Sequence, residues 1–181
     1  MTEHCTNNDN DRKMGAYWER QFALMAGKYN RAFSFMQIGR ADSAQFFFLG
    51  EQWNHYTLPD IAIWTSPGEH HEIKHKAPTS HNSFGLEVYR FGALMKFAAI
   101  TQQRVMYTIH DHSMSGGKGN TFNDINHWLT ANVVDLDGKF VGPFPGSSWV
   151  GGIKKQVPIY YWDKSLWQPL ADFWMREVSM A

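Results

Sequence analysis

Two segments, Leu58-Pro59-Asp60-Ile61-Ala62-Ile63-Trp64 and His71-Glu72-Ile73-Lys74-His75-Lys76, decide how this chain folds. Residues 65–68 between them, Thr-Ser-Pro-Gly, have turn chemistry, so the two segments are predicted to form a β-hairpin. Asp60 lies at the start of the first strand, where its carboxylate can meet that of Glu72 on the second. An unpaired carboxylate on such an apolar strand is costly, which favours a shared purpose for the two acids over a solvated strand edge.

Two carboxylates that converge at the end of a strand, here Asp60 and Glu72, form an oxygen-rich cage suited to Mg²⁺ or Mn²⁺. Such an ion polarises a phosphodiester and lowers the pKa of a bound water. Side chains alternate along a strand, so Lys74 shares a face with Glu72 and can orient or deprotonate that water or contact the phosphate. Glu19, on a predicted first helix, is placed to supply a third carboxylate.

The segments around this hairpin predict a mixed α/β fold. Their order is a helix over 13–28, strands within 31–64, a second helix over 84–100 with Asn82 or Ser83 as its N-cap, and a buried strand over 104–109. The weaker patterns beyond are a helix over 121–133, loops or hairpins over 138–158 and a terminal helix over 163–177. No linker or repeat divides residues 13–181, which we expect to form one domain after a disordered polar tail over 1–12.

The order helix, three strands, helix, strand, together with Pro59-Asp60 and Glu72-Ile73-Lys74, resembles the core of the PD-(D/E)xK nuclease superfamily, whose members include restriction-endonuclease-like and Holliday junction resolvase-like enzymes. The resemblance covers residues 13–110 and leaves 111–181 as an aromatic-rich extension. It implies an α+β mixed sheet and a metal-dependent DNA endonuclease that acts on branched or duplex DNA. Its catalytic residues would be Asp60, Glu72, Lys74 and Glu19, and Asp60, Glu72 and Glu19 would bind Mg²⁺ or Mn²⁺.

The second helix of many such enzymes presents polar and basic residues to the active site, and the positions available here are Glu87, Tyr89 and Arg90. The glutamine common on that helix is absent from this chain. Enzymes of this class that cut both strands of a duplex often work as pairs, so the resemblance also implies a homodimer. The candidate contacts with nucleic acid are Lys76, Tyr89, Arg90, Lys96 and Lys118.

The charge of the chain limits how it can bind DNA. Seventeen basic and 17 acidic residues give a net charge of zero, which excludes a polycation that coats DNA. Residues 70–110 nevertheless hold five basic residues and two acidic ones, a local excess of three positive charges (five minus two). This distribution favours an enzyme that recognises particular DNA structures or sites.

Two other functions share these residues. His71-Glu72-Ile73-Lys74-His75 matches the H-E-x-x-H signature of zinc peptidases, but that chemistry requires a helix, and the segment between Pro67 and Pro78 lacks an apolar stripe. A non-catalytic nucleic-acid-binding module on a nuclease-like scaffold is the second alternative. The intact set of Asp60, Glu72 and Lys74 argues against it.

The compartment follows from what the sequence lacks. The single cysteine, Cys5, allows no internal disulfide, which fits a reducing compartment. The polar N-terminal segment has no apolar core of a signal peptide, and no apolar run approaches the roughly 18 residues of a membrane span. We therefore expect a cytoplasmic protein with no membrane partner.

Overall fold

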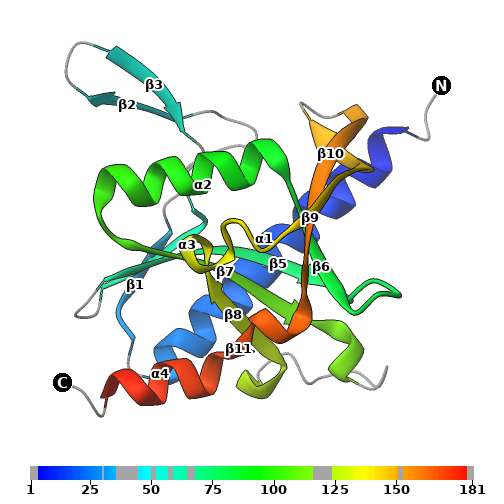
Figure 1. Cartoon of the computed structure of the whole chain (residues 1–181). Coiled ribbons are helices and arrows are strands. Elements are labelled where there is room, and N and C mark those ends of the chain that lie inside the picture. Colours follow the sequence, from blue (N-terminus) through cyan, green and yellow to red (C-terminus); the bar gives the residue numbers. More distant parts are fainter. Residues whose placement is uncertain are drawn as a thin grey trace.

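A mixed sheet of six strands forms the centre of the protein, with helices on both faces (Figure 1). The structure is a computed structural model that describes residues 4–29, 31–35, 45–49, 52–56, 59–64, 68–115, 124–150 and 153–178. The strands, in spatial order, are β1 (Phe33–Phe35), β4 (Ile61–Ile63), β5 (Glu69–Lys76), β7 (Arg104–Asp111), β8 (Trp128–Asn132) and β11 (Gln168–Pro169). The predicted mixed-sheet class is therefore confirmed.

The predicted hairpin is present as β4 and β5, which pair antiparallel with Ile61 opposite His71. β5 then pairs parallel with β7, so that Glu72 lies opposite Tyr107. Parallel neighbours need a crossover connection, and the helix α2 (Val88–Thr101) supplies it. Residues 65–67 of the turn lie outside the described part of the chain.

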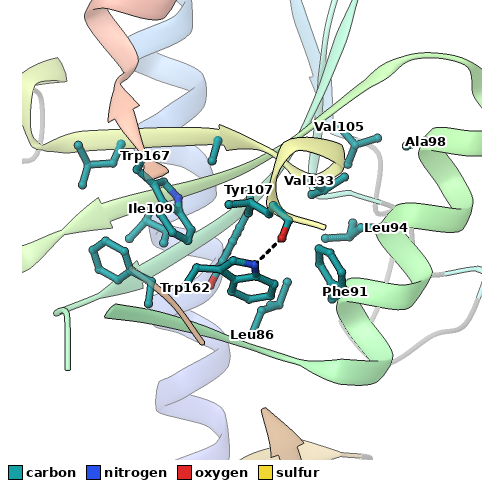
Figure 2. Packing of buried hydrophobic residues seen from close by; sticks show 14 of the residues in the cluster. Leu86, Phe91, Leu94, Ala98, Val105, Tyr107, Ile109, Val133, Trp162 and Trp167 are labelled. Carbon is teal, nitrogen blue, oxygen red and sulfur yellow. Dashed lines mark hydrogen bonds between the residues drawn. The ribbon is translucent and has the colours of Figure 1, made fainter. Parts of the chain in front are cut away.

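Two hydrophobic clusters hold the helices against opposite faces of the sheet. On one face α1 (His4–Lys28) and α4 (Leu170–Val178) pack around residues that include Phe22, Trp128 and Trp174. On the other face α2 and the short α3 (Val133–Leu136) pack around Tyr107 and Trp162, as Figure 2 shows. Helix α1 begins at His4, within the segment expected to be a tail.

The second helix is shorter than its sequence pattern predicts. Residues 84–87 belong to the strand β6 (Ser83–Glu87), and the helix begins at Val88 with Glu87 as its N-cap rather than Asn82 or Ser83. The prediction over these residues was wrong because β6 pairs with a strand remote in sequence, β10 (Ile153–Asp163), in which Trp162 lies opposite Phe84. Local periodicity carries no information about such a partner.

The extension is built into the domain. β9 (Val141–Val150) pairs with β10 to form a three-stranded sheet with β6, while β8 and β11 complete the main sheet. The Trp162 indole N–H donates to the carbonyl of Leu136 at 2.8 Å, in the cluster under α2 (Figure 2). The helix predicted over 121–133 is wrong, since 128–132 form β8, and the terminal helix begins at Leu170 rather than at 163.

The remaining elements are short. β2 (Gln45–Leu49) and β3 (Gln52–Tyr56) form a separate hairpin, and 3₁₀ helices follow over His112–Ser115, Ile125–His127 and Lys164–Leu166. Within the described ranges, no helix has the length and apolar character needed to cross a membrane.

Candidate active site

Asp60 and Glu72 are adjacent where β4 and β5 pair. Each lies one residue beyond the Ile61–His71 pair, Asp60 immediately before β4 and Glu72 within β5. The Asp60 Oδ2 atom accepts a 2.7 Å hydrogen bond from the backbone N–H of Ile73, which fixes its carboxylate against the neighbouring strand. Asp60 is 4% exposed and Glu72 is fully buried. The hairpin therefore brings the two acids together, as the sequence predicts.

Two cations neutralise this buried pair. Arg90, in the first turn of α2, donates from Nε to Glu72 Oε1 at 2.7 Å, and its Nη2 lies 3.8 Å from Asp60 Oδ1. The Lys74 ammonium donates to the same Oε1 atom of Glu72. Burial alone disfavours an ionised Glu72, but the charges and hydrogen bonds of Arg90 and Lys74 outweigh it and hold the pKa of Glu72 below its usual value.

For Asp60 and Glu19, in contrast, burial outweighs the nearby positive charges, and the pKa of each carboxyl is raised. Burial raises the pKa of Asp60 to about 6, and the negative charge of Glu72 adds to that rise. Glu19, on α1, interacts electrostatically with the same site. Burial and then the charge of Asp60 raise its pKa to about 7. The predicted third carboxylate is therefore electrostatically coupled to the other two. Groups with such shifted pKa values are typical of catalytic sites.

The ligand atoms at this site are of the type that a hard divalent cation prefers. Asp60, Glu72 and Glu19 offer oxygen atoms alone, and Glu72 Oε2 is buried without a hydrogen-bond partner in the described structure. Among the described residues, however, no three His, Cys, Asp or Glu side chains are grouped closely enough to enclose an ion. Arg90 and Lys74 supply the positive charge around these acids in this conformation.

The predicted nucleic-acid contacts fall into different environments. Tyr89 is 49% exposed at the start of α2, and Lys96 is exposed further along the same helix. Arg90 is only 14% exposed, since its guanidinium contacts the site carboxylates. Lys76 donates to the carbonyl of Gly85 rather than projecting into solvent. Lys118 lies outside the described residues.

The zinc-peptidase interpretation is wrong because its motif lies on β5 and not on a helix. His71 and His75 project from the face opposite Glu72. His71 Nδ1 lies 2.7 Å from the Thr108 hydroxyl, and the His75 ring stacks on Trp18 with ring centroids 4.0 Å apart. Both histidines are packing residues, and Glu72 is separated from them by the sheet.

Sequence reasoning anticipated this region only in part. It offered Arg90 both as a DNA contact and as a residue that the second helix presents to the active site, and in the structure its guanidinium bonds to Glu72 and lies 3.8 Å from Asp60. It also assigned no role to β10, whose Ile159 and Tyr161 line a cleft beside β5 and β6. No local pattern links β10 to that cleft, because the pairing joins strands some 70 residues apart.

Together these elements form a restriction-endonuclease-like fold, with an acidic pair, a lysine and an arginine at the junction of β4, β5 and α2. The solved structure of Hjc, a Holliday junction resolvase from the archaeal hyperthermophile Archaeoglobus fulgidus, matches the chain with a TM-score of 0.51. The match covers 90% of this chain and 96% of the Hjc chain at 11% sequence identity. At that identity the likeness shows the fold alone. The sequence matches no family model and no curated protein.

Proposed function

We propose that this protein is a Mg²⁺-dependent DNA endonuclease that hydrolyses phosphodiester bonds. The observation that carries the proposal is the convergence of Asp60, Glu72 and Lys74 on one buried site of a restriction-endonuclease-like fold. Burying two adjacent acids costs free energy even with Lys74 and Arg90 as counter-charges, because desolvation can exceed the ion-pair gain, so their presence at the junction of two strands favours a functional role.

Each residue has a distinct role in this proposal. Asp60, Glu72 and Glu19 would hold Mg²⁺ or Mn²⁺, which supplies Lewis acidity and a more acidic water when bound. The Lys74 ammonium forms an ion pair with Glu72, and from this position it would orient the attacking water or the scissile phosphate. Arg90 fixes the Glu72 carboxylate in one orientation and offsets the negative charge that phosphate would meet at this site.

A branched DNA is the first substrate to test, because the structural neighbour Hjc is a Holliday junction resolvase. A four-way junction presents two strands for cutting, and the described residues of one chain form one such site. We therefore propose that the enzyme acts as a homodimer.

A non-catalytic DNA-binding module is the second candidate. One observation favours it. Lys74 and Arg90 both pair with Oε1 of Glu72, and the described acids are not grouped closely enough to enclose a metal ion. In that function the charged cluster would stabilise the fold while the exposed residues of α2 contact DNA.

Cleavage assays separate these two functions. The protein is incubated with a four-way junction, linear duplex, supercoiled plasmid and single-stranded DNA, each with Mg²⁺, Mn²⁺ or EDTA. We expect Mg²⁺- or Mn²⁺-dependent cleavage, and a loss of at least about 100-fold in rate for Lys74→Met and Asp60→Asn. Lys28→Met, at the exposed end of α1, is the matched control and should cleave normally.

DNA binding is measured on the same variants by fluorescence anisotropy. Binding without cleavage in every cation would establish the module instead of the enzyme. Full cleavage by Lys74→Met and Asp60→Asn would show that the nuclease uses another site. Sedimentation of the protein with and without junction DNA tests the homodimer.

A further inference from the structure

A cleft of about 290 Å³ opens beside the candidate active site, between the end of β5, the loop that follows it, β6 and β10. It is lined by Lys76, Ala77, Thr79, Ser83, Gly85, Ile159 and Tyr161. Lys76 lies two residues beyond Lys74 on the same face of β5, about 6.6–6.8 Å along the strand. A DNA strand rises about 3.4 Å per nucleotide along its axis, so the cleft lies one or two nucleotides from Lys74.

Lys76 brings an ammonium group to this cleft. Its ammonium donates to the carbonyl of Gly85 and lies 5.9 Å from the centroid of the Tyr107 ring. Among the described residues, no carboxylate is within ion-pair distance of it; Glu87 acts on it only at longer range and accepts from the Ser148 hydroxyl at 2.6 Å. An ammonium has three donors, so Lys76 keeps capacity to bind an anion.

Two hydroxyl groups line the cleft next to Lys76. Thr79 Oγ1 lies 2.6 Å from Ser83 Oγ, and the Thr79 N–H donates to the Ser83 carbonyl at 2.8 Å. The N–H groups of His81 and Ser83 approach Thr79 Oγ1 at 3.3 and 3.4 Å, so the loop holds these hydroxyls in place. One hydroxyl proton is used between Thr79 and Ser83, so the pair retains one O–H for a ligand, and this O–H together with the Lys76 ammonium is a donor set that suits a phosphate oxygen.

The far wall of the cleft comes from the extension. A Cβ atom on Gly85 would lie 2.7 Å from Cε1 of Tyr161, so only glycine at this position lets the tyrosine ring lie against β6. Ile159 packs beside it, and a Gly85 Cβ would lie 2.9 Å from its Cγ2. An aromatic ring beside a phosphate-binding group offers a surface on which a sugar or base can rest.

We propose that this cleft binds a phosphate of the DNA strand one or two nucleotides from the scissile phosphodiester, with Lys76 and one hydroxyl of the Thr79–Ser83 pair as donors and the Tyr161 ring against the adjoining nucleoside. The proposal rests on the proposed nuclease function. It gives the extension a role in that function, because β10 supplies one wall of the subsite. The same chemistry would suit a free mononucleotide, and the experiment separates the two sources.

The test replaces single phosphates by neutral methylphosphonates, one or two nucleotides to either side of the mapped cleavage point in a four-way junction. With the unsubstituted protein, one such replacement should weaken binding in EDTA about tenfold, the value of one charge-assisted hydrogen bond. Lys76→Met should raise KM about tenfold with kcat unchanged, and the methylphosphonate should cause no further loss in that variant. Ser83→Ala provides a smaller change in the same direction.

Lys28→Met should retain the methylphosphonate effect, and melting curves establish that each variant folds. Equal KM for Lys76→Met and the unsubstituted protein, with normal cleavage by both, would overturn the subsite and leave the nuclease standing. Calorimetric binding of deoxyadenosine monophosphate that is lost in Lys76→Met, without a change in KM for DNA, would make the cleft a free-nucleotide site. No cleavage or binding of any DNA would overturn the nuclease function and the subsite together.

Discussion

Arg90 Nε donates a 2.7 Å hydrogen bond to Glu72 Oε1, and this bond joins the first turn of α2 to the middle of β5. The same guanidinium lies 3.8 Å from Asp60. Its position therefore links the docking of α2 on the sheet to the charge of the acidic pair.

Replacement of Arg90 by methionine should destabilise the fold. The change leaves Glu72 buried with Lys74 as its remaining cationic partner, so the pKa of Glu72 rises and the free energy of unfolding falls by about 3 kcal/mol at pH 7. Urea denaturation measures the change. Lys96→Met, at an exposed position of α2, should alter stability by less than about 0.5 kcal/mol.

The double variant Arg90→Met with Glu72→Met is the sharper control. Removing both charges should recover much of the lost stability, because the cost comes from a buried charge without its partner. If Arg90→Met and the unsubstituted protein unfold at the same urea concentration, the bond has no stabilising role.

Asp60→Asn should stabilise the protein at alkaline pH. The pKa of Asp60 is raised to about 6 in the folded protein, against 3.8 ordinarily, so the folded state binds the extra proton between these values. Stability from this group is present below pH 4 and is lost as the pH rises through 6. Asparagine cannot ionise and still accepts from the Ile73 N–H, so the variant should gain roughly 1–3 kcal/mol at pH 8 and little at pH 4.

Thermal melts at pH 4 and pH 8 measure this difference. In a domain of this size each kcal/mol shifts the melting temperature by about 2–4 °C. Asp135→Asn, at an exposed position of α3, is the matched control and should show no such pH-dependent gain. A melting temperature for Asp60→Asn that stays at or below that of the unsubstituted protein at pH 8 would contradict the raised pKa.

Binding of a divalent cation should weaken as the pH falls through 7 and then 6. Carboxylates bind metal ions in their ionised form, and the pKa values of Glu19 and Asp60 are raised to about 7 and about 6. Titration calorimetry with Mn²⁺ at pH 5.5, 7 and 8.5 follows this loss. In Glu19→Gln the midpoint should move towards 6, whereas Asp135→Asn should leave it unchanged. Affinity for Mn²⁺ that does not vary with pH would remove these acids from the metal site.

The hairpin was predictable from the sequence because its determinants are local. The turn residues between the segments and the alternation along residues 71–76 place Asp60 beside Glu72 and set Lys74 on the same face. The order of helices and strands from α1 to β7 followed in outline from the same periodicities, apart from β6, which the sequence pattern assigned to the second helix.

The secondary-structure predictions that were wrong concern segments whose structure depends on contacts with segments distant in the sequence. Residues 84–87 have helical spacing, but their pairing with β10 makes them a strand, and residues 128–132 become a strand because they pair with β7. For the same reason the sequence left two roles open for Arg90, a contact with DNA and a place at the active site. Only the packing of α2 on β5 decides whether that side chain faces DNA or the site.

The ring of Trp18 stacks on two histidines, at centroid distances of 4.0 Å from His75 and 4.2 Å from His110. Trp18 is buried, so Trp18→Ala should lower the free energy of unfolding by about 3–5 kcal/mol, measured by urea denaturation at pH 7.5. Tyr17→Ala, at the exposed neighbouring position, should have a much smaller effect. Equal losses in the two variants would contradict a specific role for the stack.

The two stacked histidines should also make the protein sensitive to mild acid. Burial is the main cause that lowers the pKa of His75 and of His110 to about 4 each. Neighbouring imidazoles act in the same direction, His112 on His75 and chiefly His75 and His127 on His110, against the weaker opposing charge of Asp111. The unfolded chain binds these protons near pH 6.5, so between pH 6.5 and 4 it holds more protons than the folded state. Stability should therefore fall as the pH is lowered through this window.

Urea denaturation at pH 7.5, 6, 5 and 4 measures that slope in the unsubstituted protein and in His110→Gln. Glutamine does not titrate, so the variant should lose less stability than the unsubstituted protein between pH 6 and pH 4, whatever its stability at pH 7.5. The carboxylates titrate in both proteins, and the difference between the two slopes isolates the histidine. Parallel slopes would mean that His110 accepts its proton in the folded state as readily as in the unfolded chain, and the stack with Trp18 would then impose no cost on imidazolium.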